Sequence, residues 1–336
     1  MKLAFFVNEV VTEVDEYTTT RFARGAAKMG HEVWYIGVGD VHYDSDGGMT
    51  ADGHRAAFDS SDDLKSFLGR AQDEGSRQEL PLGELDALVL RNDSIEDLHE
   101  RPWAVNLGVV FGHMLVDRGI CVVNSPRGLA RAASKLYLEE FPDEIRPKTL
   151  VSRDPDEVKS FIEKIGSAVL KPLYGAKGRN VFFVEEVDDP NLSQIIESVL
   201  EDGYLFVQER IENADRSDLR MFLLEGEIME MNGRYAAIRR VPKGSDPRAN
   251  ISTGGKPEPA ELGDREFAVA EAMKSRLVED GMFFVGIDLI DDKVVEINAE
   301  SPGGMQSVEH FTSLDFAPLF IDRLEEKARR GPARPT

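Results

Sequence analysis

Three oxygen-bearing side chains near the C-terminus have the type and spacing of a magnesium site. Asp288, Glu296 and Asn298 lie in the stretch VGIDLIDDKVVEIN, which predicts two strands joined by a short turn. A three-residue turn at 291–293 would place Asp288 opposite Glu296, with Asn298 on the same face, because side chains alternate along a strand. Mg²⁺ prefers an octahedral shell of oxygen ligands, which phosphate oxygens can complete. The alternative is an ordinary half-exposed hairpin.

The same turn predicts an apolar face for this hairpin. Ile287, Leu289, Val295 and Ile297 would fall on the side opposite the carboxylates and be buried. A two-residue turn would instead set Glu296 against Ile287, which is a poor pair. The pairing of charged and apolar residues therefore favours the longer turn.

A lysine followed by two glycines has the pattern of a phosphate-binding loop. Lys171 lies on the predicted strand AVLKP, and a buried ammonium group needs an anion because burying it alone is costly. Gly175 and Gly178 in the next turn would let the backbone approach phosphates closely. Because another strand follows, the pattern indicates a flap over a nucleotide and not a Walker loop. The alternative is a strand-end lysine that reaches solvent.

A run of cations interrupts the acidic chain. Its members, with an asparagine two residues beyond the last, are Arg220, Arg234, Arg239, Arg240, Lys243, Arg248 and Asn250. Asp246 is the only acid between residues 234 and 248. Arginine binds carboxylate and phosphate through paired hydrogen bonds, and phosphoryl transfer needs such groups. The alternative is a solvated basic face.

A weaker pattern lies between the lysine and the cations. The stretch FVQERI at 206–211 runs off a predicted strand, and Asp215 follows it. This order suits a hinge whose backbone contacts adenine and an acid that contacts ribose hydroxyls. A plain strand end is the alternative.

The composition of the chain excludes several classes of protein. The 336 residues include 40 Lys+Arg and 62 Asp+Glu, a net charge of −22 that argues against nucleic acid as a partner. No stretch approaches the roughly 18 apolar residues of a membrane span, and KLAFFV at 2–7 reads as a first strand. A single cysteine, Cys121, excludes an internal disulfide. We expect a cytoplasmic globular protein that avoids membranes and gathers its cations into a local positive pocket for anionic substrates.

Alternating apolar patterns predict the elements that must position these residues. Strands and helices alternate over the first ~125 residues, which indicates an α/β domain with a mainly parallel sheet. Its expected elements are strands at 2–7, 31–37, 86–90 and 119–123, helices at 20–29 and 103–118, and an amphipathic segment at 62–72. Beyond it we expect helices at 128–140, 192–200, 264–279 and 316–329, another helix beginning near 156, strands at 168–172, 180–186 and 204–210, and the hairpin at 284–298.

In their order along the chain, these residues resemble the prokaryotic-type glutathione synthetases of the ATP-grasp superfamily. The resemblance covers nearly the whole sequence, from the opening strand to FVGIDLI…EINAESP at 284–302. Between them lie NSPxxxxxxxxKLY at 124–137, VLKPxxGxxG at 169–178 and RRVPKGSDPRANISTGGKPE at 239–258. The GxxxxGK[ST], GxGxxG, GxSxG and HExxH motifs are absent.

The resemblance implies an α/β (α+β overall) ATP-grasp fold with three domains. The N-terminal mainly parallel α/β domain would span 1–125, and a linker helix with the central lid domain 126–207. A C-terminal antiparallel-sheet domain would span 208–330, followed by a disordered tail at 331–336. ATP would be held between the last two domains.

The resemblance also implies site residues, carried over by position. Those holding ATP would be Lys135, Lys171, Gly175, Gly178, Gln208, Glu209, Arg210, Ile211 and Asp215. Those facing the transferred phosphoryl group would be Arg220, Arg240, Arg248 and Asn250. Asp288, Glu296 and Asn298 would hold two Mg²⁺ ions, with Mn²⁺ as a substitute. Substrates would contact Thr18, Thr19, Arg91, Asn92, Ser301, Gly303 and Gly304.

The implied reaction is an ATP-dependent carboxylate–amine ligation. A substrate carboxylate attacks the γ-phosphate to give an acyl-phosphate and ADP, and an amine then displaces phosphate to leave an amide. In this family the acid is γ-glutamylcysteine and the amine is glycine, and a homo-oligomer is expected. Positioning and charge neutralisation supply the acceleration without a protein nucleophile. The alternatives are an ATP-grasp peptide ligase of different specificity and a non-catalytic nucleotide-binding regulatory protein.

Two loops depart from the family pattern. The flap reads Tyr174-Gly-Ala-Lys-Gly178 where the family typically has Asp-Gly-x-Gly-Gly. The segment after Asn298 reads Ala-Glu300-Ser-Pro-Gly-Gly304 where the family usually has N-x-x-SPT. The second departure falls near the expected carboxylate ends of the substrates.

Overall fold

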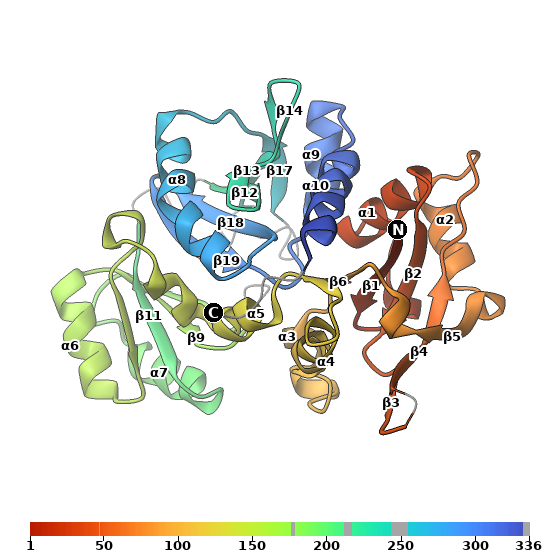
Figure 1. Cartoon of the computed structure of the whole chain (residues 1–336). Helices are drawn as coiled ribbons and strands as arrows, with labels where there is room; N and C mark the ends of the chain where they lie inside the picture. Colours follow the sequence, from red (N-terminus) through yellow and green to blue (C-terminus); the bar gives the residue numbers. More distant parts are fainter. Residues whose placement is uncertain (47, 176–178, 212–216, 243–254, 332–336) are drawn as a thin grey trace.

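A computed structural model describes residues 1–46, 48–175, 179–211, 217–242 and 255–331 of the protein. Over these residues the strands form sheets of seven, four and six strands and a two-stranded ribbon. Figure 1 shows the seven-stranded sheet on one side of the molecule, the four-stranded sheet on the other, and the six-stranded sheet above and between them. This mixed α/β architecture agrees with the expected fold class.

The N-terminal sheet contains the predicted parallel strands. Its strand order is β3-β4-β2-β1-β6-β7, and β5 pairs with β4. The parallel strands are β2 (Glu32–Gly37), β1 (Lys2–Val7), β6 (Ala87–Leu90) and β7 (Cys121–Val123). Helices α1 (Thr18–Lys28), α2 (Leu64–Ala71), α3 (Ser94–Glu100) and α4 (Leu107–Val116) accompany them. The predicted strands and the amphipathic helix are therefore confirmed.

Three antiparallel strands extend one edge of this sheet, and the sequence analysis missed them. They are β3 (Val41–Asp44), β4 (Gly48–Arg55) and β5 (Arg77–Pro81). Their residues are mostly polar and rich in Asp and Gly, which are depleted in strands, so the local pattern resembles a loop. Strand pairing stabilises them together with a few buried apolar residues, namely Met49 and Ala51 on β4 and Leu80 on β5.

Helix α1 also fixes the N-terminal sheet to the C-terminal part of the chain. Phe22 of α1 stacks on Phe320 of α10 (Ala317–Arg330) with ring centroids 4.0 Å apart. A Cβ added to Gly25 would lie 2.4 Å from the Cβ of Ala317, so the glycine permits close helix contact. This packing holds the ends of β1 and β6 in a defined position relative to the six-stranded sheet.

The segment between the first two sheets differs from its prediction. The expected helix at 128–140 is instead a short helix, α5 (Pro126–Ala132), followed by a 3₁₀ helix at Lys135–Glu140. Ser125 caps α5, and the chain is extended at Ser134 between the two pieces. The interruption brings the Lys135 backbone N–H to the carbonyl of Leu173, 3.3 Å away, which links this segment to the flap.

The four-stranded sheet is antiparallel, in the order β10-β9-β11-β8. Its strands are β8 (Thr149–Ser152), β9 (Ala168–Pro172), β10 (Phe182–Val184) and β11 (Leu205–Glu209). Helices α6 (Pro155–Ile165) and α7 (Leu192–Glu201) enclose an apolar core with it. Strand β8 was not predicted, because it follows a proline-containing connection.

The six-stranded sheet is also antiparallel and follows the order β17-β16-β12-β18-β19, with β13 on β12. Its strands are β12 (Asp218–Leu224), β13 (Glu227–Ile228), β16 (Ala237–Val241), β17 (Lys256–Pro259), β18 (Phe284–Ile290) and β19 (Lys293–Asn298). The ribbon is β14 (Glu230–Met231) with β15 (Arg234–Tyr235), and α8 (Asp264–Glu279) and α9 (Met305–Thr312) complete this part. Helix α9 was not predicted.

The β18–β19 hairpin has the predicted pairing but not the predicted turn. Asp288 lies opposite Glu296, and Asn298 follows on the same face. The turn contains only two residues, since Ile290 pairs with Lys293, and a bulge beyond Asp288 restores the register. Val294, which is fully buried, takes the apolar position that we assigned to Val295. A bulge adds one residue to one strand, so it has the effect of the longer turn.

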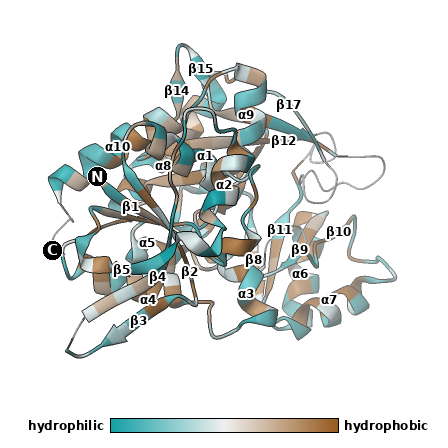
Figure 2. Ribbon diagram, turned by 90° about the vertical axis from the view of Figure 1, so that its right-hand side faces the viewer, coloured by the Kyte–Doolittle hydropathy of each residue, from teal (hydrophilic) through white to brown (hydrophobic). Residues whose placement is uncertain are grey.

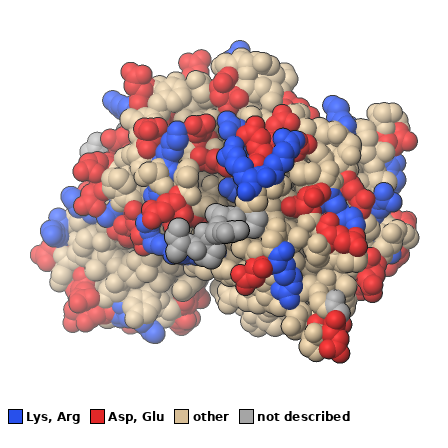
Figure 3. Space-filling view, viewed as in Figure 1, with Lys and Arg blue, Asp and Glu red and all other residues tan. Residues whose placement is uncertain are grey.

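Hydrophobic residues concentrate on the strands and on the helix faces turned toward them, and hydrophilic residues lie on the outer faces (Figure 2). In the part of the chain that is described, no helix is long and apolar enough to cross a bilayer. Acidic side chains are spread over the face shown in Figure 3, with basic ones among them. The large negative charge is thus distributed over the surface.

Candidate active site

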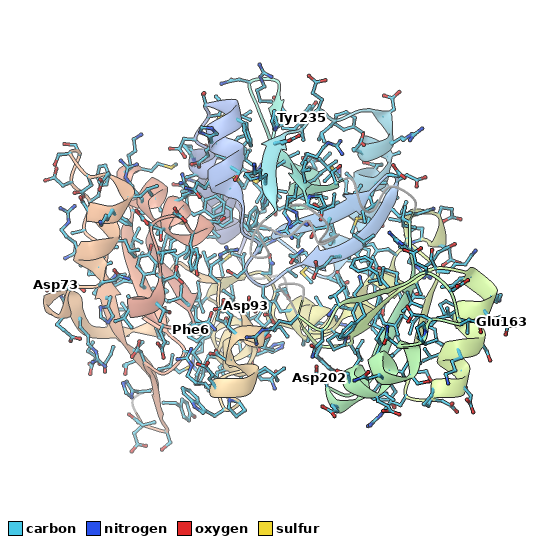
Figure 4. All side chains as sticks on the ribbon, turned by 180° about the vertical axis from the view of Figure 1, so that it is seen from behind. Phe6, Asp73, Asp93, Glu163, Asp202 and Tyr235 are labelled. Carbon is cyan, nitrogen blue, oxygen red and sulfur yellow. The ribbon has the colours of Figure 1, made fainter. Side chains whose placement is uncertain are left out.

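Two cavities meet where the three sheets converge. The larger, of about 430 Å³, lies between the N-terminal and six-stranded sheets. The smaller, of about 120 Å³, extends toward the 3₁₀ helix and the four-stranded sheet. Asp93, Glu296, Asn298 and Ser301 line both of them. Figure 4 shows Asp93 at this central position, between the N-terminal elements and the four-stranded sheet.

A buried network of charges forms the floor of the larger cavity. Arg220 on β12 donates to both oxygens of Asp288, with Nε–Oδ1 at 2.5 Å and Nη2–Oδ2 at 2.6 Å. Arg240 on β16 donates to Asp218 at 2.6 and 2.7 Å and to Asp288 Oδ2 at 2.7 Å. Cross-strand pairing places these side chains together, because Arg220 pairs with Asp288 and Asp218 with Arg240. A glycine at 286 leaves room for the Arg220 side chain, 3.4 Å from an added Cβ.

This network corrects the expectation of a positive pocket in one respect. The charges of Arg220 and Arg240 are balanced within the described residues by Asp218 and Asp288. Arg239 points to the opposite face of β16 and donates to Ser217 at 3.0 Å, while Arg234 is exposed on β15. Of the described arginines in the predicted run, the structure therefore brings two to the site.

The three predicted metal ligands lie on one face of the hairpin. Asp288 is 1% exposed, and burial would raise its pKa, but Arg220 and Arg240 outweigh burial and hold the pKa below its usual value. The Asn298 side chain lies 3.5 Å from Asp288 Oδ2. Glu296 is half-buried, and no hydrogen bond or ion pair joins its carboxylate to another described residue. Its oxygens are thus available to a ligand.

Two lysines approach Glu296 from the smaller-cavity side. Lys135 donates to the carbonyls of Pro172 and Gly175 at 3.0 and 2.6 Å, and Lys171 donates to Gln208 Oε1 at 2.9 Å. Burial lowers the pKa of Lys135 to about 8, and the Glu296 charge opposes this shift. Burial also lowers the pKa of Lys171, again opposed by Glu296. Two cations and a carboxylate thus share a largely buried space.

The residues predicted to contact adenine do not all lie on the same side of β11. Gln208 is 2% exposed, and its Nε2 lacks a partner among the described residues. Glu209 points away, toward Lys148 at 3.6 Å, and Arg210 pairs with Glu185. Ile211 is the last described residue before the gap. Gln208 therefore lies beside the lysines, and its two neighbours do not.

The predicted substrate residues of the N-terminal part lie at the larger cavity. Arg91, 4% exposed, donates to Thr19 Oγ1 and to the carbonyl of Pro302, each at 3.1 Å. Thr18 lines the cavity, and its buried Oγ1 has no partner among the described residues. Asn92 packs on helix α4, where a Cβ on Gly108 would meet its Oδ1 at 2.4 Å. Of this set, Thr18 and Arg91 line the larger cavity, Thr19 contacts it only through its hydrogen bond from Arg91, and Asn92 does not line it.

The loop after Asn298 connects two parts of the site. Ser301, Gly303 and Gly304 line the larger cavity. Glu300 accepts hydrogen bonds from the backbone and hydroxyl of Ser94, at 2.7 to 2.8 Å, so it joins this loop to the start of α3. Burial raises the pKa of Glu300 to about 7, against the effect of these hydrogen bonds.

Sequence reasoning missed three residues of the site, and four that it predicted stay predictions. Asp218 could have been found, since it lies two residues before Arg220 and so on the same strand face. Glu13 and Ser94 lie in polar segments that gave no signal. Four predicted site residues lie outside the described residues, as do residues 332–336 of the expected tail. These are Gly178, Asp215, Arg248 and Asn250.

The donor set fits a magnesium ion that also contacts phosphate. Among the described residues, no group of three or more His, Cys, Asp or Glu side chains could hold a metal alone. Asp288, Glu296 and Asn298 supply two carboxylates and one amide oxygen, and such a partial set is typical of Mg²⁺ bound together with nucleotide phosphates. The arrangement can therefore hold a cation between the two lysines and the two arginines.

Comparison with known proteins identifies the family. Residues 1–130 match the prokaryotic glutathione synthetase N-terminal domain, and residues 134–313 match the prokaryotic glutathione synthetase ATP-grasp domain. The glutathione synthetase of Brucella melitensis is 31% identical over 97% of this chain and 99% of its own length, and that of Mesorhizobium japonicum is 31% identical over 98% and 99%. The crystal structure of the D-cycloserine synthetase DcsG, 15% identical, covers 96% of this chain and 99% of its own with a TM-score of 0.63. The chain therefore belongs to the prokaryotic glutathione synthetase family of ATP-dependent ligases with the ATP-grasp fold.

Proposed function

We propose that this protein joins γ-glutamylcysteine to glycine, with conversion of ATP to ADP and phosphate. The observation that carries the proposal is the position of Glu296 and Asn298, which line both cavities. A ligand in the smaller cavity, beside Lys135 and Lys171, would meet a ligand in the larger cavity at these two side chains. Transfer of a phosphoryl group from ATP to a carboxylate requires such a meeting point.

The two lysines are suited to hold nucleotide phosphates. Both are half-buried and are influenced by the Glu296 charge, and an anion would compensate the cost of desolvating their ammonium groups. The link from Lys135 to Gly175 would also hold the start of the flap near the phosphates. Gln208, whose Nε2 lacks a described partner, would donate to the nucleotide from β11.

Asp288, Glu296 and Asn298 would hold magnesium, and we propose two ions, which Mn²⁺ could replace. The metal would neutralise charge on the transferred phosphoryl group. Arg220 and Arg240 keep Asp288 ionised and in place. Arg220 also donates to the carbonyl of Gly303 at 3.2 Å, so the same residue orients the loop predicted at the substrates.

The chain would contribute to the chemistry by positioning the substrates and by neutralising the charges of the reacting groups. Arg91 would bind a carboxylate of the peptide acid while its contacts to Thr19 and Pro302 fix its orientation. The acid's reacting carboxylate would face Glu296, and glycine would approach along Ser301–Gly304. The acyl-phosphate would then form and react where the two cavities meet.

We also propose the division of the chain into domains at 1–125, 126–207 and 208–330, and a cytoplasmic homo-oligomer. The spans of the three sheets, 2–123, 149–209 and 218–298, support this division. Light scattering coupled to size exclusion would test the oligomeric state.

A substrate panel tests the function. Protein incubated with Mg-ATP, γ-glutamylcysteine and glycine should release phosphate and form a product with the mass of the tripeptide. Omitting either substrate should abolish the product. Phosphate release with other acid–amine pairs but not with this one would contradict the proposal.

A second candidate is a peptide ligase of the same fold with a different acid or amine. Two observations favour including it. Gly303 and Gly304 replace the threonine-containing loop that the family usually has, and four acids besides Glu296 line the larger cavity, namely Glu13, Glu16, Asp93 and Glu96. The panel should therefore include amines with cationic side chains, which this lining would attract.

A further inference from the structure

A half-buried glutamate lies in the larger cavity without a role in the site described so far. Glu13 belongs to the segment between β1 and α1 and lines the cavity together with Thr18 and Arg91. Its Oε2 is buried and has no hydrogen-bond partner among the described residues. A buried acceptor that is left unpaired costs free energy, so a ligand that donates to it is favoured.

The backbone, and not the carboxylate, holds this segment in place. Gln72 donates through its side-chain amide to the carbonyls of Val10 and Glu13, each at 2.9 Å. Thr20 donates to the carbonyl of Val14 at 2.9 Å. The segment is thus fixed at both sides of Glu13 by main-chain contacts, and the Glu13 side chain is free of any structural task that the described contacts show.

Arg91 attracts Glu13 but does not pair with it. The Arg91 charge opposes the burial effect on Glu13, yet no hydrogen bond or ion pair joins the two side chains. Arg91 uses its Nε and one Nη2 hydrogen on Thr19 and Pro302, and a guanidinium has five N–H donors. Described residues leave three of its donors for a ligand, so the cavity offers both an acceptor and a set of donors.

We infer that Glu13 binds an ammonium group of the acid substrate while Arg91 binds the carboxylate beside it. The pair would thereby recognise an α-amino-acid head group, which carries both charges on one carbon. This inference rests on the proposed function, since the γ-glutamyl end of γ-glutamylcysteine is such a head group. The hydroxyl of Thr18, which lines the same cavity and has no partner in the described part of the chain, supplies a third polar contact.

A des-amino substrate isolates the contact. Glutarylcysteine matches γ-glutamylcysteine but lacks the α-ammonium, and calorimetry measures the affinity of each peptide for wild type and for Glu13→Gln. Wild type should bind γ-glutamylcysteine about 30-fold more tightly than the des-amino peptide, which is the range of a charge-assisted hydrogen bond. Glu13→Gln should reduce this preference to less than threefold, because only γ-glutamylcysteine loses a contact.

Two controls separate a direct contact from a general effect. Glu16 lines the same cavity but is exposed, so Glu16→Gln should keep most of the preference if contact and not distant charge is responsible. Binding of Mg-ATP to Glu13→Gln should stay within twofold of wild type, which shows that the fold is retained. An unchanged preference in Glu13→Gln, or no preference in wild type, would overturn the inference.

Failure of the proposed function gives a different result. Phosphate release with glycine and γ-glutamylcysteine reports on the ligation, whereas the calorimetry needs no turnover. Ligation without discrimination between the two peptides would reject the role of Glu13 alone. Discrimination that depends on Glu13 without ligation would reject the reaction and retain the binding site.

Discussion

Asp288 and Glu296 are cross-strand partners on β18 and β19, but their carboxylates have different surroundings. Asp288 accepts hydrogen bonds from Arg220 and is also paired with Arg240. Glu296 has no such partner among the described residues and faces two lysines at a distance. Two arginines thus fix Asp288 in the position where we propose that it meets the metal, whereas no described residue occupies the Glu296 oxygens.

Replacing Glu296 should remove activity and leave stability nearly unchanged. Glu296→Gln removes one anionic metal ligand without breaking a described ion pair, so we expect kcat to fall by about 10² or more. The free energy of unfolding should change by less than about 1 kcal/mol. Phosphate release over a range of Mg²⁺ concentrations and urea unfolding measure the two effects. A large loss of stability would mean that Glu296 has a structural partner.

Replacing Asp288 should reduce both the activity and the stability of the protein. Asp288→Asn leaves Arg220 and Arg240 with one aspartate between them, and breaking a buried ion pair costs about 3–5 kcal/mol. We expect a clear fall in the urea midpoint together with loss of phosphate release. Glu279→Gln, at an exposed position with one pair at 3.5 Å, is a matched control and should change neither. A stable but inactive Asp288→Asn protein would contradict the structural part of this prediction.

Lys171 should act mainly on the affinity for ATP. Lys171→Met keeps the apolar part of the side chain and removes the charge, so the KM for ATP should rise at least tenfold while the KM for the peptide acid changes little. Lys148→Met removes a lysine that is 70% exposed and should leave both values unchanged. Steady-state kinetics with each substrate varied in turn would check this. An equal effect on both substrates would place Lys171 elsewhere in the site.

The order of elements could be predicted because apolar periodicity is a local property. The strands that were missed, β3 to β5 and β8, pair with neighbouring strands, and only a few apolar residues, such as Met49 and Leu80, mark them in the sequence. The turn of the hairpin shows the same limit. The pairing of Asp288 with Glu296 followed from the polar and apolar pattern, but a bulge in β19 achieves it, and the sequence carries no separate signal for a bulge.

The candidate site shows a similar division. Charged residues on predicted strands, such as Arg220 and Lys171, could be predicted as site residues because a charge buried in a sheet needs a partner or a ligand of opposite charge. Asp218 was missed although its partner was found, since the cation run drew attention to the arginines and not to what balances them. Glu13 lies in a polar segment whose position depends on Gln72, 59 residues away, and no local pattern reports such a contact.

The ionisation of Glu13 should make stability depend on pH in a defined direction. Burial raises its pKa from 4.5 to about 7, Arg91 opposes this and Glu96 adds to it. The folded state therefore binds more protons than the unfolded state between these values, so stability falls as pH rises from about 4.5 to about 7. The full penalty, at most about 3 kcal/mol, is present above that window.

Glu13→Gln removes the ionisable group and should therefore stabilise the protein at high pH, whereas most substitutions at buried positions destabilise it. At pH 8 the variant should be more stable than wild type by about 1–3 kcal/mol, and the difference should vanish below about pH 4.5. Urea unfolding of both proteins at pH 4.5, 6 and 8 measures this difference in the free energy of unfolding. Other groups with a raised pKa, such as Glu300, are present in both proteins, so their contribution to the difference cancels. Equal stability at pH 8 would mean that Glu13 is already compensated. Because an ammonium ligand would offset the penalty, γ-glutamylcysteine should narrow the difference at pH 8.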